Sequence, residues 1–373
     1  MFHTPEELFL RYHQTRGFKT YMSFPLVIDD PTILFTNATV TPFKRMFTGE
    51  QERENFALVQ KCLRLGGSGG NLETPRTNLN HTSLFDMLGS GLFDVNQDFA
   101  VAYFVDVLVE LGLPKDRLVF TTLSHLGFDQ ALERAGINKH QIRLFADAKS
   151  LQHEWSFGEG DLHGCGVVAR FIPDNSQNLV CDDVVEELSR YVQIGRLVHI
   201  DGISRGTSVE MSTFSAYDMG IGLNRIEMAL NGNCEVSLRP WRECSKRLRF
   251  SIGNLSNGDA HYMANLFLVA ESLVSEGLLP GKKKHSFVLR KVMRLLIEEI
   301  WLQSQALVDI SSTLKQQINI SACGSLLESA FCEEENALRK ILSTARAKQE
   351  KHPEMTAMQL QATFGIRFGL LDF

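Results

Sequence analysis

A carboxylate, two glycines and an arginine stand close together over residues 218–225, where a strand-like run leads into a helical one. Asp218 comes first, Gly220 and Gly222 occupy alternate positions, and Arg225 opens the helical period. Glycine lets a backbone approach a ligand closely, and a helix N-terminus attracts anions. The pattern therefore predicts a phosphate site beside Arg225. Short Gly-x-Gly patterns also arise by chance, so an ordinary strand-to-helix turn with a solvated arginine is the alternative.

A second group of candidate residues lies on a predicted hairpin over residues 60–89. Two strand-like segments flank a glycine-rich loop, with Arg64 on the outgoing strand. Alternation along the returning strand predicts that His81, Ser83 and Phe85 share one face. An arginine, a histidine and an aromatic ring that face one way can hold phosphates and stack on a base. An ordinary surface hairpin with a half-buried phenylalanine is the competing interpretation.

The elements that position these groups fall into two regions. Up to about residue 240, short strand patterns alternate with helical ones, and beyond it long helical periods with charge-rich faces dominate. In the first region we predict helices over 4–16, 98–113 and 129–136, strands over 117–122, 142–145 and 197–201, and a glycine-rich loop over 158–166 that enters a strand ending at 172. In the second region we predict helices over 264–276, 285–303, 306–317 and 332–349. The change of pattern indicates a separate helical domain.

Length and composition limit the kind of protein. A chain of 373 residues is too long for one ordinary core and suggests two domains, or three. Its 44% hydrophobic and 22% charged residues are typical of a soluble globular protein. The formal net charge of -6 argues against general electrostatic capture of nucleic acid, so any such contact needs a local basic surface.

The sequence also predicts the cellular compartment. No apolar run approaches the roughly 18 residues that a membrane span needs. The first residues lack the basic and then apolar layout of a signal peptide. The seven cysteines are odd in number, widely spaced and without a CxxC pair. Together these features predict free thiols in the reducing cytoplasm.

Three smaller features each allow two interpretations. His163 and Cys165 suggest a metal site, although two ligands without a second pair are more often packing or loop residues. Trp155 is either a core aromatic or a pocket wall, and core packing is the default interpretation. The lysine triplet at 282–284 is typical of a solvated loop before a helix, but an acidic backbone can also dock there.

In their order along the chain, these stretches resemble the class II aminoacyl-tRNA synthetases and, among them, the N-terminal part of the alanyl-tRNA synthetases. The similarity is carried by Asp30–Ala38, Phe43–Lys44, Cys62–Gly67, His81–Gly89, Asp218–Ile226, Leu268–Pro280, Phe287–Lys291 and Thr363–Gly365. These segments cover nearly the whole chain in the family's order, so the match is more specific than any single motif. In that family, the hairpin and the stretch at 218–226 are the second and third class-defining motifs.

The resemblance implies an α+β fold. An antiparallel class II sheet flanked by helices would span residues 1–243, and an all-helical, tRNA-acceptor-binding-like domain would span residues 244–373. The implied enzyme is a ligase that uses ATP and Mg²⁺ to activate alanine, or a related small amino acid, as aminoacyl-AMP. It would pass the acyl group by default to a tRNA. We expect a cytoplasmic enzyme, with no zinc and with neither membrane nor DNA among its partners.

The resemblance also implies which residues hold ATP. Arg64 would bind the α-phosphate and the substrate carboxylate, His81 would lie toward the outer phosphates, and Phe85 would stack on adenine. The other positions expected at the nucleotide are Asp86, Met87, Gly220, Gly222 and Arg225, with Arg225 at the γ-phosphate. Arg64 and Arg225 are the expected catalytic residues, because planar guanidinium groups bind phosphate oxygens bidentately and stabilise the charge that develops there.

For the amino acid and the acceptor, the resemblance implies a further set of contacts. Asp218 would accept the amino group of the amino acid, as a carboxylate paired with an ammonium. The rest of the pocket would be lined by Trp155, Arg196 and Gly220. The expected acceptor contacts are Lys282, Lys283, Lys284 and Arg290. No metal ligand is assigned in the protein, because Mg²⁺ is expected with ATP.

Several positions depart from the family pattern. The family's Trp-Asn pair before the third motif falls on Gly195 and Arg196, and its arginine before the paired histidines falls on Asn80. The proline and cysteine loop becomes residues 158–166. The acidic residue expected beyond that loop, near the metal and phosphates, falls within residues 167–170, which are Val167, Val168, Ala169 and Arg170.

Further departures concern the acceptor. The loop that helps the family to recognise a G·U base pair becomes Gly281–His285, whose lysines carry little base information. The chain stops where the family continues into an editing domain, and no zinc-binding editing signature is present. Two alternatives therefore stay open. One is a specialised ligase that aminoacylates a carrier protein, a peptide or a small metabolite, and the other is a non-catalytic sensor of tRNA or an amino acid.

Overall fold

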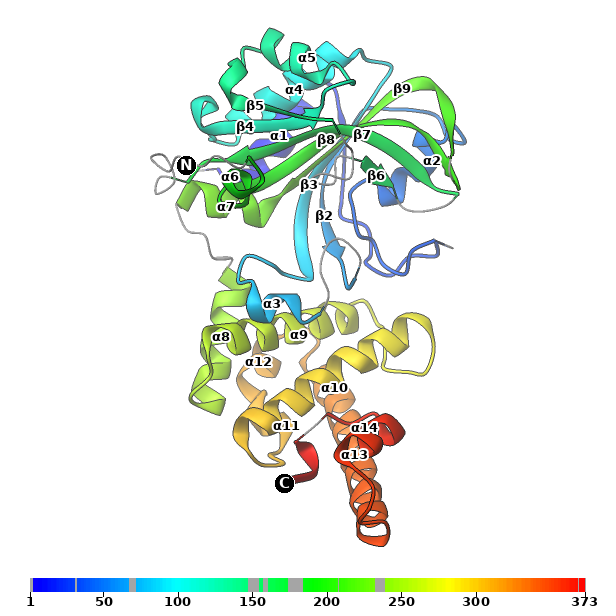
Figure 1. The fold of residues 1–373 in the computed structure, drawn as a ribbon, viewed down its shortest axis with the longest axis vertical. Helices are drawn as coiled ribbons and strands as arrows, with labels where there is room; N and C mark the ends of the chain where they lie inside the picture. Colours follow the sequence, from blue (N-terminus) through cyan, green and yellow to red (C-terminus); the bar gives the residue numbers. More distant parts are fainter. Residues whose placement is uncertain are drawn as a thin grey trace. The chain divides into compact units, whose positions relative to one another are not determined.

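The computed structural model describes residues 3–30, 32–66, 72–146, 154–156, 160–173, 184–206, 208–231, 239–367 and 369–372 (Figure 1). The chain forms two compact units. The first comprises Met1–Cys62 and Phe85–Ser237, and the second comprises Leu63–Leu84 and Leu238–Phe373. The tip of the predicted hairpin is thus part of the helical unit. We predict a boundary between two separately folding domains after residue 243. The division into compact units does not test separate folding, so this boundary stays a prediction.

A mixed sheet organises the first unit, and nine of its strands lie within the described residues. Their order is β1-β2-β3-β9-β8-β7-β4-β5, with β6 paired to β7. The strands are β1 (Lys19–Tyr21), β2 (Phe56–Leu63), β3 (Leu84–Phe93), β4 (Leu118–Leu123), β5 (Ile142–Phe145), β6 (Glu154–Ser156), β7 (Leu162–Phe171), β8 (Val192–Arg205) and β9 (Ser208–Gly222). The run from β3 through β9, β8 and β7 to β4 is antiparallel, whereas β1–β2 and β4–β5 are parallel. The predicted antiparallel sheet is confirmed at its centre, and its edges are parallel.

Alternation along β9 gives the sheet two different faces. Met219 and Ile221 are fully buried. Tyr217 points the same way, and burial, together with the charge of Asp98 in α4 (Gln97–Glu110), raises the pKa of its phenol. This face therefore lies under α4. Asp218, with the glycines that alternate after it, points to the opposite face, which we call the site face.

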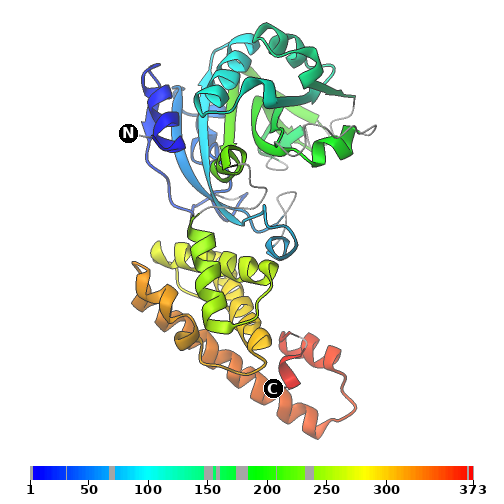
Figure 2. The ribbon, with the colours of Figure 1, turned by 90° about the vertical axis from the view of Figure 1, so that its left-hand side faces the viewer.

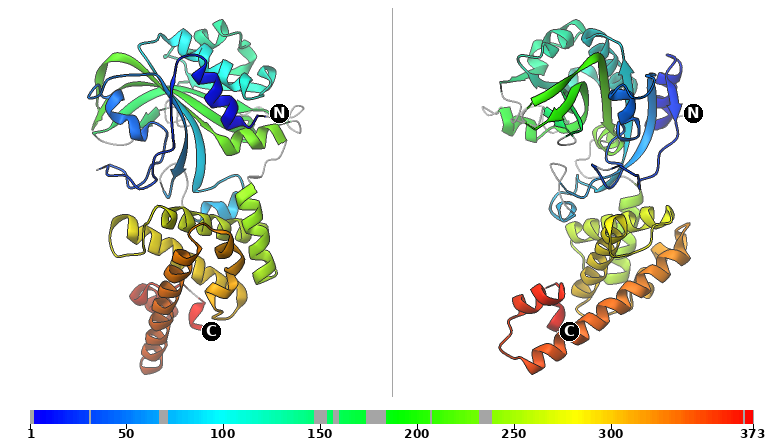
Figure 3. Two further views of the ribbon diagram at one scale, coloured as in Figure 1. Left: turned by 180° about the vertical axis from the view of Figure 1, so that it is seen from behind. Right: turned by 90° about the vertical axis from the view of Figure 1, so that its right-hand side faces the viewer.

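Helices pack on the sheet of the first unit. α4 packs on β8, and α5 (Phe128–Arg134) packs on β4 and β5 (Figure 1). α1 (Pro5–Gln14) packs on α4 and is seen in front of the strands from behind (Figure 3). Its start is a capping box, in which the Thr4 hydroxyl accepts from the Glu7 N–H and the Glu7 carboxylate accepts from the Thr4 N–H. The helix predicted over 4–16 is confirmed, although it ends two residues earlier than predicted.

The segment before β2 closes part of the site face. η1 (Thr41–Phe43) and α2 (Lys44–Phe47) contribute to a hydrophobic cluster that also contains Phe56 and Val198. Lys44 Nζ donates to the Asp30 and Asp161 carboxylates at 3.0 and 2.6 Å. These ion pairs are largely buried, so they fix the segment against the start of β7.

The second unit is helical. Its helices are α3 (Thr74–Thr77), α8 (Arg239–Ile252), α9 (Asn257–Ser275), α10 (Lys284–Ser304), α11 (Ile310–Thr313), α12 (Lys315–Ile320), α13 (Gly324–Lys351) and α14 (Ala357–Phe364). α9 is central, because α3, α8 and α10 all pack against it. α14 turns back beside the long α13 (Figure 2). The helices predicted over 264–276, 285–303 and 332–349 are confirmed as parts of α9, α10 and α13.

The structure corrects the predicted helices of this unit in two ways. The helix predicted over 306–317 is wrong, because Asp309 caps a new helix through the Ser312 N–H, and the chain forms the short α11 and α12 instead. α8 and α14 were not predicted. α8 is strongly basic, yet Trp241, Cys244 and Leu248 recur along it at helical spacing and are buried.

The structure also corrects three local predictions in the first unit and the hairpin. β7 begins at Leu162, so residues 162–166 are strand rather than loop, while residues 157–159 lie outside the described residues. β9 runs through Gly222, so the two glycines of the opening pattern lie in a strand and not in a turn. β3 begins at Leu84, so alternation does not place His81 and Ser83 beside Phe85. The His81 N–H instead donates to the Asn78 carbonyl in a turn.

A buried ion cluster holds the hairpin tip within the second unit. Arg76 Nη2 donates to Glu299 Oε2 at 2.6 Å, and Arg76 also pairs with Asp259. Arg367 Nη1 reaches the same Glu299 oxygen at 2.5 Å. The Glu299 side chain is only 3% exposed. We call these four residues the Arg76 cluster, and Tyr262, whose ring lies under the Arg76 guanidinium, adds to it.

Replacing Arg76 with methionine is expected to destabilise the protein by about 3 kcal/mol, because Asp259 and Glu299 lose a buried cationic partner. Denaturant unfolding followed by tryptophan fluorescence measures this. Arg242→Met, at a half-exposed ion pair with Glu243, is the matched control and should change stability by less than about 0.5 kcal/mol. Equal losses in the two variants would contradict a special role for the cluster.

Glu298, next to the cluster on α10, predicts a pH dependence. Burial raises the pKa of its carboxyl to about 7, against the opposing charge of Arg367. The folded state then holds this proton more tightly than the unfolded chain, so its contribution to stability is full below about pH 4.5 and is lost as the pH rises through 7. At about 1.4 kcal/mol per pKa unit, the loss is about 3 kcal/mol at most. The Glu298→Gln variant should be more stable than the parent at pH 8, and its free energy of unfolding should change less between about pH 4.5 and pH 8. The same pH profile of stability in both proteins would refute the raised pKa of Glu298.

Candidate active site

The carboxylate of the opening pattern lies on the site face of the first unit. Asp218 of β9 stands in register with Val198 of β8 on one side and Gly91 of β3 on the other. It is 5% exposed. Its two strand neighbours are small, so the fold leaves the carboxylate beside short side chains. A buried carboxylate in such a place suits an ammonium group, which compensates its charge.

Trp155 contributes to the same region. It lies on β6, in register with Gly164 of β7, and is partly buried. Its ring packs against the hydrophobic cluster that contains Val198, the register neighbour of Asp218. The default prediction of core packing stays a prediction, because a partly buried ring at the edge of the cluster fits both interpretations. The pocket-wall role that the resemblance implies stays a prediction.

The C-terminal end of β9 carries the glycine pair and leads to Arg225, which lies in the first turn of α7 (Leu223–Asn231). A Cβ at Gly222 would lie 3.0 Å from Arg225 Cγ, so the arginine folds back over this glycine. Burial lowers the pKa of Arg225. Among the described residues it forms no ion pair. Arg225 is thus a partly buried cation beside the C-terminal end of β9.

Strand β3 presents two of the three predicted nucleotide residues to this face. Met87 is in register with Gly222, and a Cβ at Gly220 would lie 3.1 Å from its sulfur. Phe85 shares the face by alternation. Asp86 points to the other side of β3, and its carboxylate lies 3.6 Å from Lys61 Nζ. The structure therefore brings Phe85 and Met87 together with the glycines but not Asp86.

Strand β8 supplies the residues that depart from the family pattern. Arg196 lies in register with Gly220 on one side and Val168 on the other, so it belongs to the site face. At Gly195 a Cβ would lie 2.5 Å from the Gly220 carbonyl oxygen. This position therefore requires glycine in this fold, and the space that a tryptophan would occupy does not exist here.

Arg170 is a site residue that the sequence alone did not single out. Alternation along β7 places it on the face that Val168 and Arg196 share. Burial lowers the pKa of Arg170, and the charge of Arg225 lowers it further. The signal in the sequence was an arginine within the otherwise apolar run of residues 166–172. Its meaning depends on strand register, which the sequence does not give.

Two residues that we expect to bind the nucleotide, Arg64 and His81, belong to the second unit. The Arg64 N–H donates to the Ser83 carbonyl at 2.8 Å. The His81 carbonyl accepts from His261 Nε2 of α9 at 2.8 Å, and the Ser83 N–H donates to Asn265 Oδ1 at 2.8 Å. α9 therefore fixes the backbone of the hairpin tip. The roles of Arg64 and His81 toward ATP stay predictions.

The basic loop of the second unit is exposed as predicted. Lys282, Lys283 and Lys284 are exposed at the start of α10. The Arg290 guanidinium lies 5.6 Å from the ring of Phe287, one turn along the helix. Their role toward an acceptor stays a prediction.

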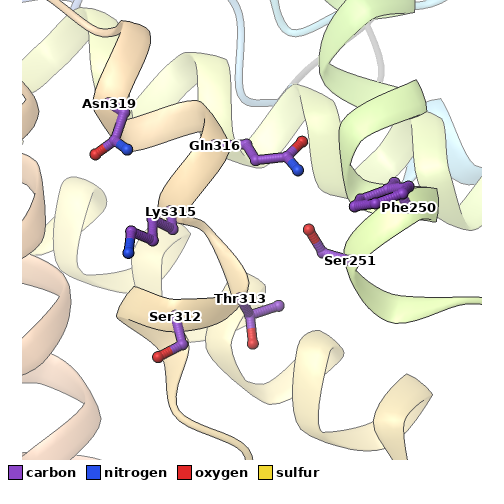
Figure 4. Close-up of a pocket in the computed structure, with 7 residues that line it drawn as sticks. All are labelled: Phe250, Ser251, Ser312, Thr313, Lys315, Gln316 and Asn319. Carbon is purple, nitrogen blue, oxygen red and sulfur yellow. The ribbon is translucent and has the colours of Figure 1, made fainter.

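A separate pocket of about 640 Å³ opens between α8, α11 and α12 (Figure 4). It contains none of the predicted site residues. Its lining residues are Phe250, Ser251, Ser312, Thr313, Lys315, Gln316 and Asn319.

The described part of the chain offers no metal centre. It holds no group of three histidines, cysteines, aspartates or glutamates that could bind a metal ion. His163 Nδ1 lies 2.7 Å from Asp201 Oδ1, so this histidine has a structural partner. A protein-held Mg²⁺ does not fit this part of β7 either, because residues 167–170, where the resemblance places an acidic ligand, contain no carboxylate.

Comparison with known proteins defines the class. Residues 6–356 match the family of class II (A) tRNA synthetases, and the chain belongs to that family. The alanine--tRNA ligase of Ehrlichia canis (strain Jake) is 30% identical over an alignment of 304 positions that covers 77% of this chain and 33% of that protein. The corresponding ligase of Ehrlichia chaffeensis is 28% identical over 356 aligned positions that cover 92% of this chain and 39% of that protein. That of Ruegeria sp. (strain TM1040) is 27% identical over 398 aligned positions, gaps included, that cover 97% of this chain and 44% of that protein.

The chain thus spans less than half of the length of these curated relatives. Among solved structures, the apo histidyl-tRNA synthetase of S. aureus aligns with a TM-score of 0.37 and 8% identity, over 60% of this chain and 63% of that one. Within the described residues, no helix is both long and apolar enough to cross a membrane.

Gly195→Ala tests the tight contact of β8 with β9. We expect a loss of about 1–3 kcal/mol in the free energy of unfolding, because the added Cβ meets a backbone oxygen that cannot rotate away. Gly66→Ala is the control, since a Cβ there has no neighbour within 4 Å. A neutral Gly195→Ala would mean that β8 and β9 have room for a side chain at this position.

Proposed function

We propose that this chain is a ligase that activates an amino acid with ATP and transfers the acyl group to an acceptor, by default the 3′ end of a tRNA. The observation that carries the proposal is the charge pattern of the site face. Asp218 lies within β9, and the side-chain stem of Arg225 lies over Gly222 at the C-terminal end of the strand. Four residues of extended chain separate Asp218 from Gly222, which is about 13 Å. Membership of the class II (A) tRNA synthetases supports the same chemistry.

The proposed first step is adenylate formation. A carboxylate oxygen of the amino acid attacks the α-phosphorus of ATP and forms the new P–O bond. The bond from that phosphorus to the bridging oxygen breaks, and its electron pair leaves with pyrophosphate. Asp218 pairs with the ammonium group and so orients the carboxylate, while Arg225 holds the γ-phosphate. Fixed guanidinium groups suit this step, because its catalysis is mainly positioning and electrostatic stabilisation.

The remaining nucleotide contacts follow from the family roles. We propose that Arg64 binds the α-phosphate, that His81 lies toward the outer phosphates, and that Phe85 stacks on adenine. Met87 and the two glycines of β9 shape the floor. ATP enters as its Mg²⁺ complex, so the metal comes with the substrate. A cytoplasmic location, where ATP and tRNA are available, is part of the proposal.

The amino acid is alanine or a related small amino acid. Trp155 packs against the cluster that contains Val198, the register neighbour of Asp218, and a bulky ring there favours an amino acid with a small side chain. Arg196 adds a cation where the family has an asparagine, so an acidic or polar analogue is the main competitor. We include Trp155, Arg196 and Gly220 in the proposed pocket.

The acceptor is the second question. Lys282, Lys283 and Lys284 with Arg290 form the proposed contact to an acceptor backbone, since exposed lysines bind phosphates readily. They carry little base information, and this observation favours the specialised ligase as a second candidate, with a carrier protein, peptide or small metabolite as acceptor.

A pyrophosphate-exchange screen over all amino acids tests activation. We expect exchange with alanine or one small relative. Arg225→Gln should lower kcat/KM for ATP on the order of a hundredfold to a thousandfold, and Arg64→Ala should abolish exchange. Asp218→Asn should raise KM for the amino acid about tenfold or more, since a buried charge pair is lost. Arg205→Gln, at an exposed ion pair with Glu210, is the control.

The same preparation answers the acceptor question. Incubation with total tRNA and the activated, radiolabelled amino acid should charge one tRNA, and efficient charging would exclude the specialised ligase. Adenylate formation without charging would favour that second candidate. No exchange with any amino acid would point to the non-catalytic sensor.

A further inference from the structure

Arg170 is a partly buried arginine whose charge no carboxylate among the described residues balances. Its Nε is buried without a hydrogen-bond partner, and its Nη1 reaches only the Leu188 carbonyl, at 3.4 Å. It makes no ion pair within the described part of the chain. An arginine in such a place is costly to the fold, because a buried charge needs a compensating partner.

A second partly buried cation, Arg225, lies near Arg170. Arg170 lies in register with Gln193 of β8. Arg225 lies over Gly222, and a Cβ there would stand 3.8 Å from the Ile194 carbonyl, one residue along β8. The two guanidinium groups are close enough for the charge of one to lower the pKa of the other. Two like charges that converge with no carboxylate partner among the described residues favour the binding of an anion.

The charge and shape of the site favour a polyphosphate. Two guanidinium groups carry two positive charges and two planar sets of donors. A carboxylate brings one negative charge and two oxygens, whereas a terminal phosphate brings more charge and three oxygens on one centre. Guanidinium forks match phosphate oxygens in bidentate pairs.

We propose that Arg170 and Arg225 together bind the terminal phosphates of a nucleoside triphosphate and then the pyrophosphate that leaves. This proposal rests on the proposed function and extends it to Arg170, which lies in the range 167–170 where the resemblance places an acidic residue. The positive charge at the outer phosphates comes from the side chain itself, so the clamp works without a protein-held metal. Arg170 contacts the substrate in this proposal and is therefore a catalytic residue.

Direct binding tests the clamp without relying on turnover. Tripolyphosphate is titrated into the full chain by calorimetry in buffer with EDTA, and the same is done for AMP. Arg170→Gln should weaken tripolyphosphate binding about tenfold to a hundredfold, the usual effect of losing charged hydrogen bonds. AMP, which lacks the outer phosphates, should show no change. Arg205→Gln, at the exposed pair with Glu210, should bind tripolyphosphate like the parent.

Stability separates a ligand-binding role from a structural one. Arg170→Met removes an uncompensated buried charge and should raise the thermal midpoint, whereas an arginine that holds the fold together would lower it. If Arg170→Gln fails to fold, Arg170→Lys takes its place in the binding test. It keeps the charge but not the planar guanidinium, and should show an intermediate loss of tripolyphosphate binding. Unchanged binding in Arg170→Gln, an equal loss in Arg205→Gln, or no tripolyphosphate binding by the parent would each overturn the clamp.

The pyrophosphate-exchange assay keeps the two proposals apart. Tripolyphosphate binding that depends on Arg170, in a chain that activates no amino acid, would retain the clamp and reject the proposed ligase. Exchange that Arg170→Gln leaves unchanged would retain the ligase and reject the clamp. If both hold, Arg170→Gln raises KM for ATP and for pyrophosphate about tenfold or more, while KM for the amino acid stays the same.

Discussion

The register of β9 between β3 and β8 is the constraint on which the site face depends. It sets Asp218 against Gly91 and Val198, and Gly220 against Gly89 and Arg196. A slip of one residue would turn Asp218 toward the helices and bring Met219 and Ile221 to the site face, because side chains alternate with a period of two. The burial of these two apolar residues therefore fixes the direction of the carboxylate. The chemistry of the face is positioned by the packing of the other face.

Glycine is what permits this register. At Gly195 and Gly220 the backbones of β8 and β9 approach so closely that a Cβ on the first would meet the carbonyl of the second. At Gly222 the missing side chain gives the Arg225 stem its place. The departure from the family's Trp-Asn pair is therefore a local change of architecture, in which Arg196 is brought onto the site face without a bulky neighbour.

The sequence predicted what short-range patterns determine. The helices that became α1 and α10 both follow from local spacing. It failed where residues far apart in sequence decide. The backbone at His81 and Ser83 is held by His261 and Asn265, about 180 positions further along, and no local pattern reveals that. Arg170 is a similar case, since only strand pairing places it near Arg225. α8, by contrast, was missed although its buried residues recur at helical spacing.

The partly buried arginines of the chain are of two kinds: some have carboxylate partners, and others have none among the described residues. The contrast between them indicates what the second kind does. Arg76 is compensated by Asp259 and Glu299, and the pKa of its guanidinium is raised by that pairing despite burial. The fold can therefore build a carboxylate partner where an arginine serves packing. Arg170 and Arg225 receive none from the described residues, and burial lowers the pKa of both. A structural arginine without a counter-charge would be replaceable by an apolar residue with a gain in stability. Their retention on the site face is better explained by a counter-charge that arrives with the substrate.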